Sequence, residues 1–510
     1  MTNPNTPKID DNLLYRRQYF IGPKFVDRFK SWNRINIGKN IHVTAHPDLT
    51  VTTAKKGDTE LALLGFMFDS QNYQSDHKTI LNEIISNNPE FADVIQATSR
   101  YAGRWIMIYS NNSESKLFHD PGGLRQVFYC QNDTETWCSA QPHNLAEILD
   151  KTKDVSKDLY EFLNSKAFEL NERNLVGRET LYKDIYHLYP NHYLDLKNSS
   201  FTRYWPDSVF EQLPIDTVVD QNSKILTELL KAAKHRHQIA QILTAGWDTR
   251  VLLSASKSFK NDNYYFVHKF PNMDSNHEDI HIPQELSSKM DFKLDVIDCS
   301  DYNTEFDKIN TKNVSMVQSD KKKFQYYNYY SQFQNKLIIS GNVSPLIKEL
   351  FHPVDNVSAV NLARLLHYHN SKFALKAISE WLNVSLTIAK EYNVSIEKLF
   401  YWELRFGTWA PMYNSELDIA VEEFSPYNCR DLINNSLSTP ASFRIKPNYI
   451  LYTKVINNLW PELLEISTNP HSNQLINKKK KYFIKKGMDF LRNIGLYNLV
   501  RFFYRKLILK

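Results

Sequence analysis

One segment near the middle of the chain combines residue types suited to holding a phosphate. It reads Leu243-Thr244-Ala245-Gly246-Trp247-Asp248-Thr249-Arg250 and follows the apolar stretch 238–243. Small residues at 244–246 let backbone N–H groups approach an anion, and the N-terminal end of a following helix attracts negative charge. Asp248 is placed to hold Mg²⁺ on that phosphate, and Thr249 adds a hydroxyl donor. A helix capped by Asp248, without any ligand, would give much of the same pattern.

Glycine spacing excludes two common nucleotide-binding loops. The chain has 13 glycines, and no two of them are two or five positions apart. Neither GxGxxG nor GxxxxGK can therefore occur, which rules out the dinucleotide fingerprint and the P-loop.

A second motif, HExxH at 277–281, is the pattern of a zinc protease helix. We expect Pro283 to interrupt that helix, and no third ligand follows at the usual spacing. Zinc chemistry is therefore not favoured.

Composition indicates a folded protein of several domains. The 510 residues are 42% hydrophobic and 23% charged, which is typical of globular chains and long enough for two to four domains. The four cysteines form no CxxC pair, so we expect free thiols and a cytoplasmic location. No stretch is apolar enough for a membrane span or a secretory signal.

Positive charge is concentrated at the C-terminus. Residues 471–510 carry eleven Lys or Arg and one Asp, a net +10, so the other 470 residues carry −5 of the total of +5. Within 478–510 apolar and basic residues interleave, which predicts an amphipathic segment that docks on the core or contacts an anionic membrane. The body is not basic enough to predict nucleic-acid binding.

The order of the expected elements divides the chain. After a polar leader at 1–10, residues 11–207 show short β-branched and aromatic segments between turns, which predicts an α+β layered domain. Residues 185–196 look like a hairpin, and 82–95 look like one helix. From 208 to 470, strands at 238–243, 264–268, 294–298 and 337–340 alternate with helices, which predicts an α/β parallel sheet followed by a helical part.

Residues 243–249 (LTAGWDT) resemble the SGGxDS pyrophosphate loop of the asparagine synthetase family, in the TxGxDSR form of its relatives from surface-polysaccharide gene clusters. Four later segments resemble further motifs in family order. They are the helix after the second strand (277–290), the second loop GxGxDE (337–342), PFxDxR (424–430) and a late signature (459–464). This resemblance covers about residues 240–470.

Upstream, residues 101–105 and 120–123 resemble the core of the family's glutamine amidotransferase domain. The resemblance implies an N-terminal-nucleophile-hydrolase-like domain at 11–207 and a pyrophosphatase-type nucleotide-binding domain at 208–470. Family glutaminases use an N-terminal Cys, whereas this chain has Thr2 in its polar leader. We therefore expect a degenerate domain without glutaminase activity.

The synthetase half also departs from the family. The acidic pair expected after residue 342 is replaced by Val343-Ser344-Pro345, so Asp248 would be left to bind the metal alone. The family's active-site lysine aligns with Asn448, and Lys446 is the nearest candidate for its catalytic role.

The resemblance implies an ATP-dependent ligase that adenylates a small-molecule carboxylate and then forms an amide, using Mg²⁺-ATP. Ammonia or an amine would come from solution or from a separate ammonia-supplying partner. The alternative is a non-catalytic nucleotide-binding or scaffold protein. Asp248 would hold the metal and act in catalysis with Lys446, and the residues expected to contact the nucleotide are Leu243, Thr244, Ala245, Gly246, Trp247, Asp248, Thr249, Arg250, Val267, Gly341 and Asn342.

Overall fold

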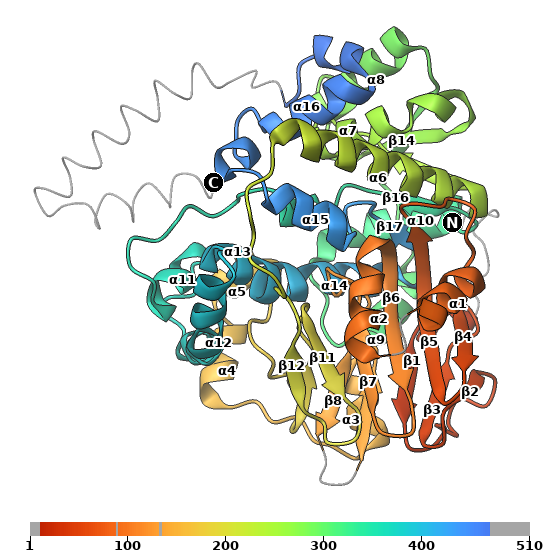
Figure 1. Cartoon of the computed structure of the whole chain (residues 1–510). Coiled ribbons are helices and arrows are strands. Elements are labelled where there is room, and N and C mark those ends of the chain that lie inside the picture. The colour runs from red at the N-terminus through yellow and green to blue at the C-terminus, as the bar shows by residue number, and fades with distance from the viewer. Residues whose placement is uncertain (1–10, 88–89, 132–134, 470–510) are drawn as a thin grey trace, which may run out of the picture. The chain divides into compact units, whose positions relative to one another are not determined.

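The computed structural model describes residues 11–469 except 88–89 and 132–134 (Figure 1). The predicted leader 1–10 and the basic segment 471–510, with its amphipathic part 478–510, lie outside these residues. The described residues up to Ile466 belong to a first compact unit. None of the helices in the described ranges has the length and apolarity needed to cross a membrane.

The N-terminal half contains two six-stranded antiparallel sheets. Their strand orders are β10-β8-β9-β1-β3-β2 and β12-β11-β7-β6-β5-β4. The strands are β1 Tyr19–Gly22, β2 Asn33–Ile37, β3 Ile41–Ala45, β4 Val51–Lys56, β5 Thr59–Asp69, β6 Tyr101–Ser110, β7 Ser115–His119, β8 Phe128–Gln131, β9 Thr136–Ser139, β10 Ile185–His187, β11 His192–Asp195 and β12 Phe201–Arg203.

These sheets stack face to face between helices because side chains alternate along each strand. On β5, Ala62 and Leu64 point to the other sheet, whereas Leu61 and Leu63 join a cluster with α1 and α2. A third cluster packs α3 on the far face of the first sheet. The result is a layered α+β domain, as predicted. Its helices are α1 His77–Asn87, α2 Phe91–Ala97, α3 Pro142–Ile148, α4 Lys157–Leu163 and α5 Lys166–Leu170.

The C-terminal half is built on a five-stranded sheet in which every strand pair is parallel. Its order is β15-β14-β13-β16-β17. This arrangement confirms the predicted α/β parallel-sheet class. The strands are β13 Ile239–Ile242, β14 Tyr264–Lys269, β15 Leu294–Asp298, β16 Leu337–Ile339 and β17 Glu423–Phe424.

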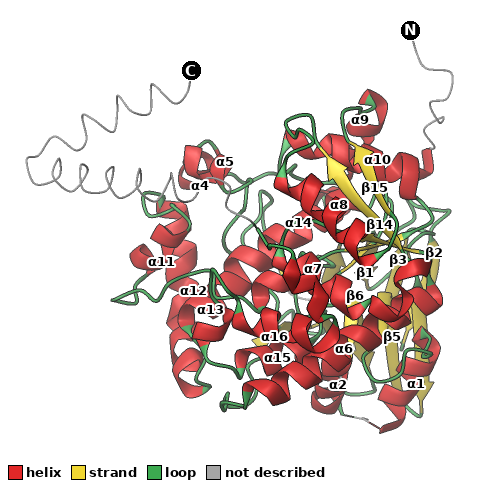
Figure 2. Cartoon of the chain, turned by 90° about the horizontal axis from the view of Figure 1, so that it is seen from above, coloured by secondary structure: helices red, strands yellow, loops and turns green. Residues whose placement is uncertain are grey.

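Helices cover both faces of this sheet (Figure 2). One apolar cluster joins the sheet to α6, α7 and α8, and another joins it to α9, α10 and α14. The later part of the chain is mainly helical, as predicted, and includes a π-helical turn at Tyr401–Phe406. The helices are α6 Ile215–Arg236, α7 Trp247–Ala255, α8 Glu278–Met290, α9 Thr304–Asn313, α10 Lys323–Phe333, α11 Ala359–Leu365, α12 Lys372–Glu391, α13 Ile396–Phe400, α14 Gly407–Leu417, α15 Arg430–Leu437 and α16 Ile450–Leu459.

Three local predictions were wrong. The segment 185–196 is not a hairpin, because β10 pairs with β8 in one sheet and β11 pairs with β7 and β12 in the other. The single helix expected at 82–95 is two helices, α1 and α2. Pro283 does not end α8, which runs through it with Ile280, Ile282 and Leu286 buried, so packing outweighs the one hydrogen bond that proline removes.

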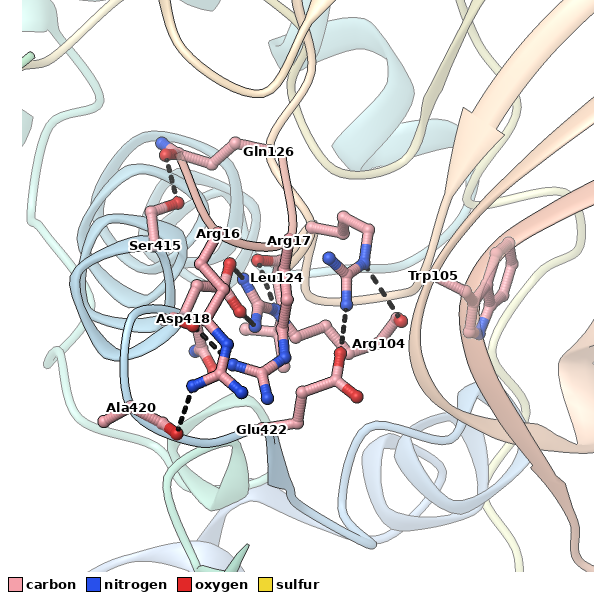
Figure 3. Close-up of polar contacts among 12 residues, drawn as sticks. Arg16, Arg17, Arg104, Trp105, Leu124, Gln126, Ser415, Asp418, Ala420 and Glu422 are labelled. Carbon is pink, nitrogen blue, oxygen red and sulfur yellow. Dashed lines mark hydrogen bonds and ion pairs between the residues drawn. The ribbon is translucent and has the colours of Figure 1, made fainter. Parts of the chain in front are cut away.

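A buried ionic cluster joins the antiparallel sheets to the parallel-sheet half (Figure 3). The two terminal guanidinium nitrogens of Arg104 donate to the Asp418 carboxylate, at 2.5 and 2.7 Å, and Arg125 donates to Glu422 at 2.7 Å. Arg16 and Arg17 donate to backbone carbonyls of residues 418–420. Burial lowers the pKa of Arg17 to about 10. Burial also acts to lower the pKa of Arg104, but the charge and hydrogen bonds of Asp418 together with the charges of Glu422 and Asp120 outweigh it, so the pKa of Arg104 is raised.

We predict that Asp418→Asn lowers the free energy of unfolding by about 3–5 kcal/mol, because it leaves the Arg104 charge buried without its partner. Glu161→Gln is the control, since Glu161 forms an exposed pair with Lys157 at 4.0 Å and should change stability by less than about 1 kcal/mol. Urea unfolding measures both variants, and equal effects would contradict a structural role for the buried pair.

Candidate functional site

The loops that follow β13 and β16 lie side by side at the carboxyl edge of the parallel sheet. These two strands are neighbours, and the chain order reverses between them, with β14 and β15 on one side and β17 on the other. In open parallel sheets such a reversal forms a crevice that binds ligands. The predicted phosphate loop and the predicted second loop therefore meet where the topology favours a site.

Side chains of the protein already bind the backbone N–H groups of the first loop. Thr244 N donates to Thr249 Oγ1 at 3.1 Å, and Gly246 N donates to Thr244 Oγ1 at 3.2 Å. Ala245 N donates to the Asp279 carboxylate at 3.0 Å. A carboxylate thus occupies one position at which the sequence predicted a phosphate oxygen.

The start of α7 differs from that of a helix capped by Asp248, which was the alternative explanation of the sequence pattern. Its N-cap is Gly246, in an extended conformation and without a side-chain cap bond, and Asp248 lies inside the first turn. Capping by Asp248 is therefore not the reason for the pattern.

Asp248 joins the two loops. Ser344 Oγ donates to Asp248 Oδ1 at 2.5 Å, and the Lys348 ammonium forms an ion pair with the same oxygen. Tyr427 donates its hydroxyl to the Asp248 carbonyl at 2.9 Å. The side chain of Lys348 is 11% exposed and that of Asp248 is 29% exposed, so the pair is mostly shielded from water.

Gly341 allows the two loops to approach this closely. A Cβ atom at position 341 would lie 2.6 Å from Cβ of Asp248, which is too near for any side chain. The neighbouring Asn342 donates its amide to Glu423 of β17 at 2.7 Å. Burial raises the pKa of Glu423, although its hydrogen bonds act in the opposite direction.

Aromatic rings surround the Lys348 ammonium. Its Nζ atom lies 5.0 Å from the ring centre of Tyr449 and 5.6 Å from that of Tyr452. The two rings stack at 5.8 Å, and Trp247 meets Tyr449 edge-on at 6.4 Å. Burial, followed by the Asp248 charge, raises the pKa of Tyr449 to about 12 and also raises the pKa of Tyr452, so both hydroxyls are neutral at pH 7.

Other residues expected to bind the nucleotide have different surroundings. Arg250 is buried and donates to the carbonyl oxygens of Leu463 and Ile466, so its charge attaches α7 to the end of the first unit. Burial lowers the pKa of Arg250 to about 10. Leu243 and Val267 are buried in the core, and Lys446 is exposed beside Pro447. The structure does not bring Lys446 to the pair of Asp248 and Lys348.

The residues present do not fit a Mg²⁺ ion held by the protein. No group of three or more His, Cys, Asp or Glu side chains among the described residues could bind a metal ion. Mg²⁺ commonly binds one or two carboxylates together with substrate phosphates. At this site the one carboxylate predicted for it, Asp248, already faces an ammonium group.

The HExxH pattern has a structural role instead. His277 caps α8 by accepting from Asp279 N at 3.2 Å, and His281 lies 3.1 Å from the carbonyl of Asn276. The pattern therefore places Asp279 in the first turn of α8, where its carboxylate reaches Ala245 N of the phosphate loop.

No family model matches the sequence, and no curated protein matches it. One similar solved structure is an NH3-dependent NAD synthetase from Campylobacter jejuni, with 15% sequence identity over 37% of this chain and 92% of that chain and a TM-score of 0.21. Another is an NMN synthetase from Francisella tularensis, with 14% identity over 38% of this chain and 93% of that chain and a TM-score of 0.20. A glutamine phosphoribosylpyrophosphate amidotransferase from B. subtilis is similar over 66% of this chain and 72% of that chain, with 8% sequence identity and a TM-score of 0.25. At these TM-scores the similarities carry no functional argument.

We predict that Gly341→Ala lowers the free energy of unfolding by about 1–3 kcal/mol, because the added methyl group meets the first carbon of the Asp248 side chain, which has little freedom to move. Gly57→Ala is the comparison, since a Cβ there meets nothing within 4 Å and costs only the strain of a positive φ. Chemical unfolding of both variants measures the difference. If Gly341→Ala lowers the free energy of unfolding no more than Gly57→Ala does, the close approach of the two loops is contradicted.

Proposed function

We propose that this protein is an ATP-dependent amide-forming ligase of the asparagine-synthetase-like type. ATP would place its β- and γ-phosphates on the loop 244–249. A carboxylate would attack the α-phosphorus, which breaks the bond to the β-phosphate and releases pyrophosphate, and ammonia or an amine would then displace AMP from the acyl-adenylate. The observation that carries the proposal is the meeting of two strand-end loops, one rich in N–H donors and one with the Lys348 cation, at the reversal of strand order.

The hydrogen bonds within the loop support an anion as the ligand. Ala245 N already binds a carboxylate, and the N–H groups of Thr244 and Gly246 bind hydroxyl oxygens. A pyrophosphate that displaces these oxygens would keep every donor satisfied. Its negative charge would be met by the first turn of α7 and by Lys348. Thr244, Gly246 and Thr249 are the residues proposed to contact it.

The nitrogen donor is proposed to be free ammonia, an amine, or ammonia supplied by a separate protein. Glutamine hydrolysis of the family type needs a thiol nucleophile that ionises. All four cysteines are buried without disulfides, and burial raises the thiol pKa of each of them. Thr2 lies outside the described residues.

A second candidate is a nucleotide-binding protein without catalysis. The specific observation in its favour is the second loop, in which Val343-Ser344-Pro345 stands where the resemblance implies an acidic pair. The exposed position of Lys446 agrees with this reading. Both candidates bind ATP, and only the ligase releases pyrophosphate.

We predict that the protein binds ATP in calorimetry and releases pyrophosphate when one of a panel of small carboxylates is added with ammonium. Thr249→Val should weaken ATP binding at least tenfold, because it removes the hydroxyl that orders the loop amides. Thr311→Val on α9 is the matched control, since its hydroxyl binds only a helix carbonyl.

The outcomes separate the candidates. Binding with carboxylate-stimulated release supports the ligase, and binding without release for any carboxylate supports the non-catalytic protein. Absence of ATP binding would contradict both.

A further inference from the structure

The group opposite Asp248 is an ammonium where the sequence predicted a metal. Lys348 Nζ and Ser344 Oγ both bind Asp248 Oδ1. We propose that Lys348 is the cation that meets bound phosphate at this site, so that phosphate and pyrophosphate groups bind without a divalent metal. This inference rests on the proposed function, because it concerns the same loop, and it defines the ligand class as metal-free polyphosphate.

The backbone that carries Lys348 is fixed by two other buried cations. Lys398 Nζ donates to the carbonyl oxygens of Leu346 and Lys348, and Arg444 donates to that of Ile347 at 3.1 Å. Three consecutive carbonyl groups therefore bind positive side chains. Such support holds a side chain where it is needed before a ligand arrives. The position of Lys348 is thus determined by the fold rather than by a flexible surface loop.

The surroundings of the ammonium suit a cation with hydrogen-bonding protons better than a metal ion. Two ring faces, from Tyr449 and Tyr452, lie within 5.6 Å of Nζ and attract positive charge. Ring faces supply no ligand oxygens, whereas Mg²⁺ requires six oxygens in near-octahedral geometry. The described residues also provide no cluster of metal-binding side chains here.

A phosphate entering at the loop would share the ammonium with Asp248. An ammonium has three protons and donates to more than one oxygen at once. Asp248 then acts as the group that aims Lys348, and its negative charge opposes the phosphate rather than binding it through a metal. Binding through Lys348 and binding through a metal on Asp248 therefore predict opposite changes in phosphate affinity when the Asp248 charge is removed.

The test is calorimetry with inorganic pyrophosphate as the probe, in EDTA and in excess Mg²⁺, on the full chain. We expect wild-type affinity in EDTA to match that in Mg²⁺ within about threefold. Asp248→Asn should bind pyrophosphate in EDTA as tightly as wild type or several-fold more tightly, because one opposing charge is gone. A site that needs a metal on Asp248 would instead lose binding in this variant.

Lys348→Met should weaken pyrophosphate binding in EDTA at least tenfold, and Mg²⁺ should recover part of the loss because Asp248 is then free to take a metal. Lys376→Met is the control, since Lys376 is largely exposed and pairs with Glu179 on the surface. Circular dichroism and thermal unfolding establish that each variant is folded.

Two results would overturn the inference while leaving the proposed function intact. One is wild-type binding of pyrophosphate or ATP that requires Mg²⁺, and the other is unchanged binding by Lys348→Met in EDTA. Absence of pyrophosphate and ATP binding by the wild type in both buffers would reject the proposed function together with this inference.

Discussion

The ion pair between Asp248 and Lys348 is the interaction on which the site depends. It joins a residue in the first turn of α7 to the loop after β16, and those elements meet only because β13 and β16 are neighbours in the parallel sheet. Gly341 permits the close approach, and Ser344 holds the same carboxylate oxygen. A largely shielded ion pair needs further contacts to offset the loss of water. Here the Ser344 hydroxyl donates to the carboxylate, and the rings of Tyr449 and Tyr452 lie within 5.6 Å of the ammonium.

Two consecutive glutamates connect this site to the antiparallel half of the molecule. Glu423 of β17 accepts from Asn342 of the second loop, whereas the preceding Glu422 accepts from Arg125. Through Glu422, Arg125 belongs to the same buried ionic cluster as Arg104 and Asp418. The antiparallel domain, for which we propose no glutaminase activity, therefore helps to position β17 and the second loop that Glu423 contacts.

The sequence was informative where the signal is local. The strand, small-residue turn and helix at 238–255 and the parallel order of the next strands follow from hydrophobic patterns, and the structure confirms both. The two-residue strand β17 is too short to have such a pattern. The pairing of β10 and β11 with different sheets depends on contacts distant in sequence, which local alternation does not encode.

The site residues also divide into those that a local sequence pattern predicts and those that distant contacts bring to the site. The loop 244–249 was predictable from its small residues, but Lys348 was not, because its partner Asp248 is 100 positions away and no residue type near 348 marks an ion pair. Tyr449 and Tyr452 reach the site from α16 and its N-cap for the same reason. For Arg250, closeness in sequence was misleading. It is next to the loop in sequence, but its guanidinium binds carbonyls of residues 463 and 466.

The most direct measurement is a crystal structure of the protein soaked with ATP and Mn²⁺, with anomalous data collected for manganese. The account predicts phosphate oxygens within hydrogen-bonding distance of Lys348 Nζ and no manganese peak at metal-ligand distance from the Asp248 carboxylate. A manganese ion bound to Asp248, with the lysine displaced from it, would contradict the account.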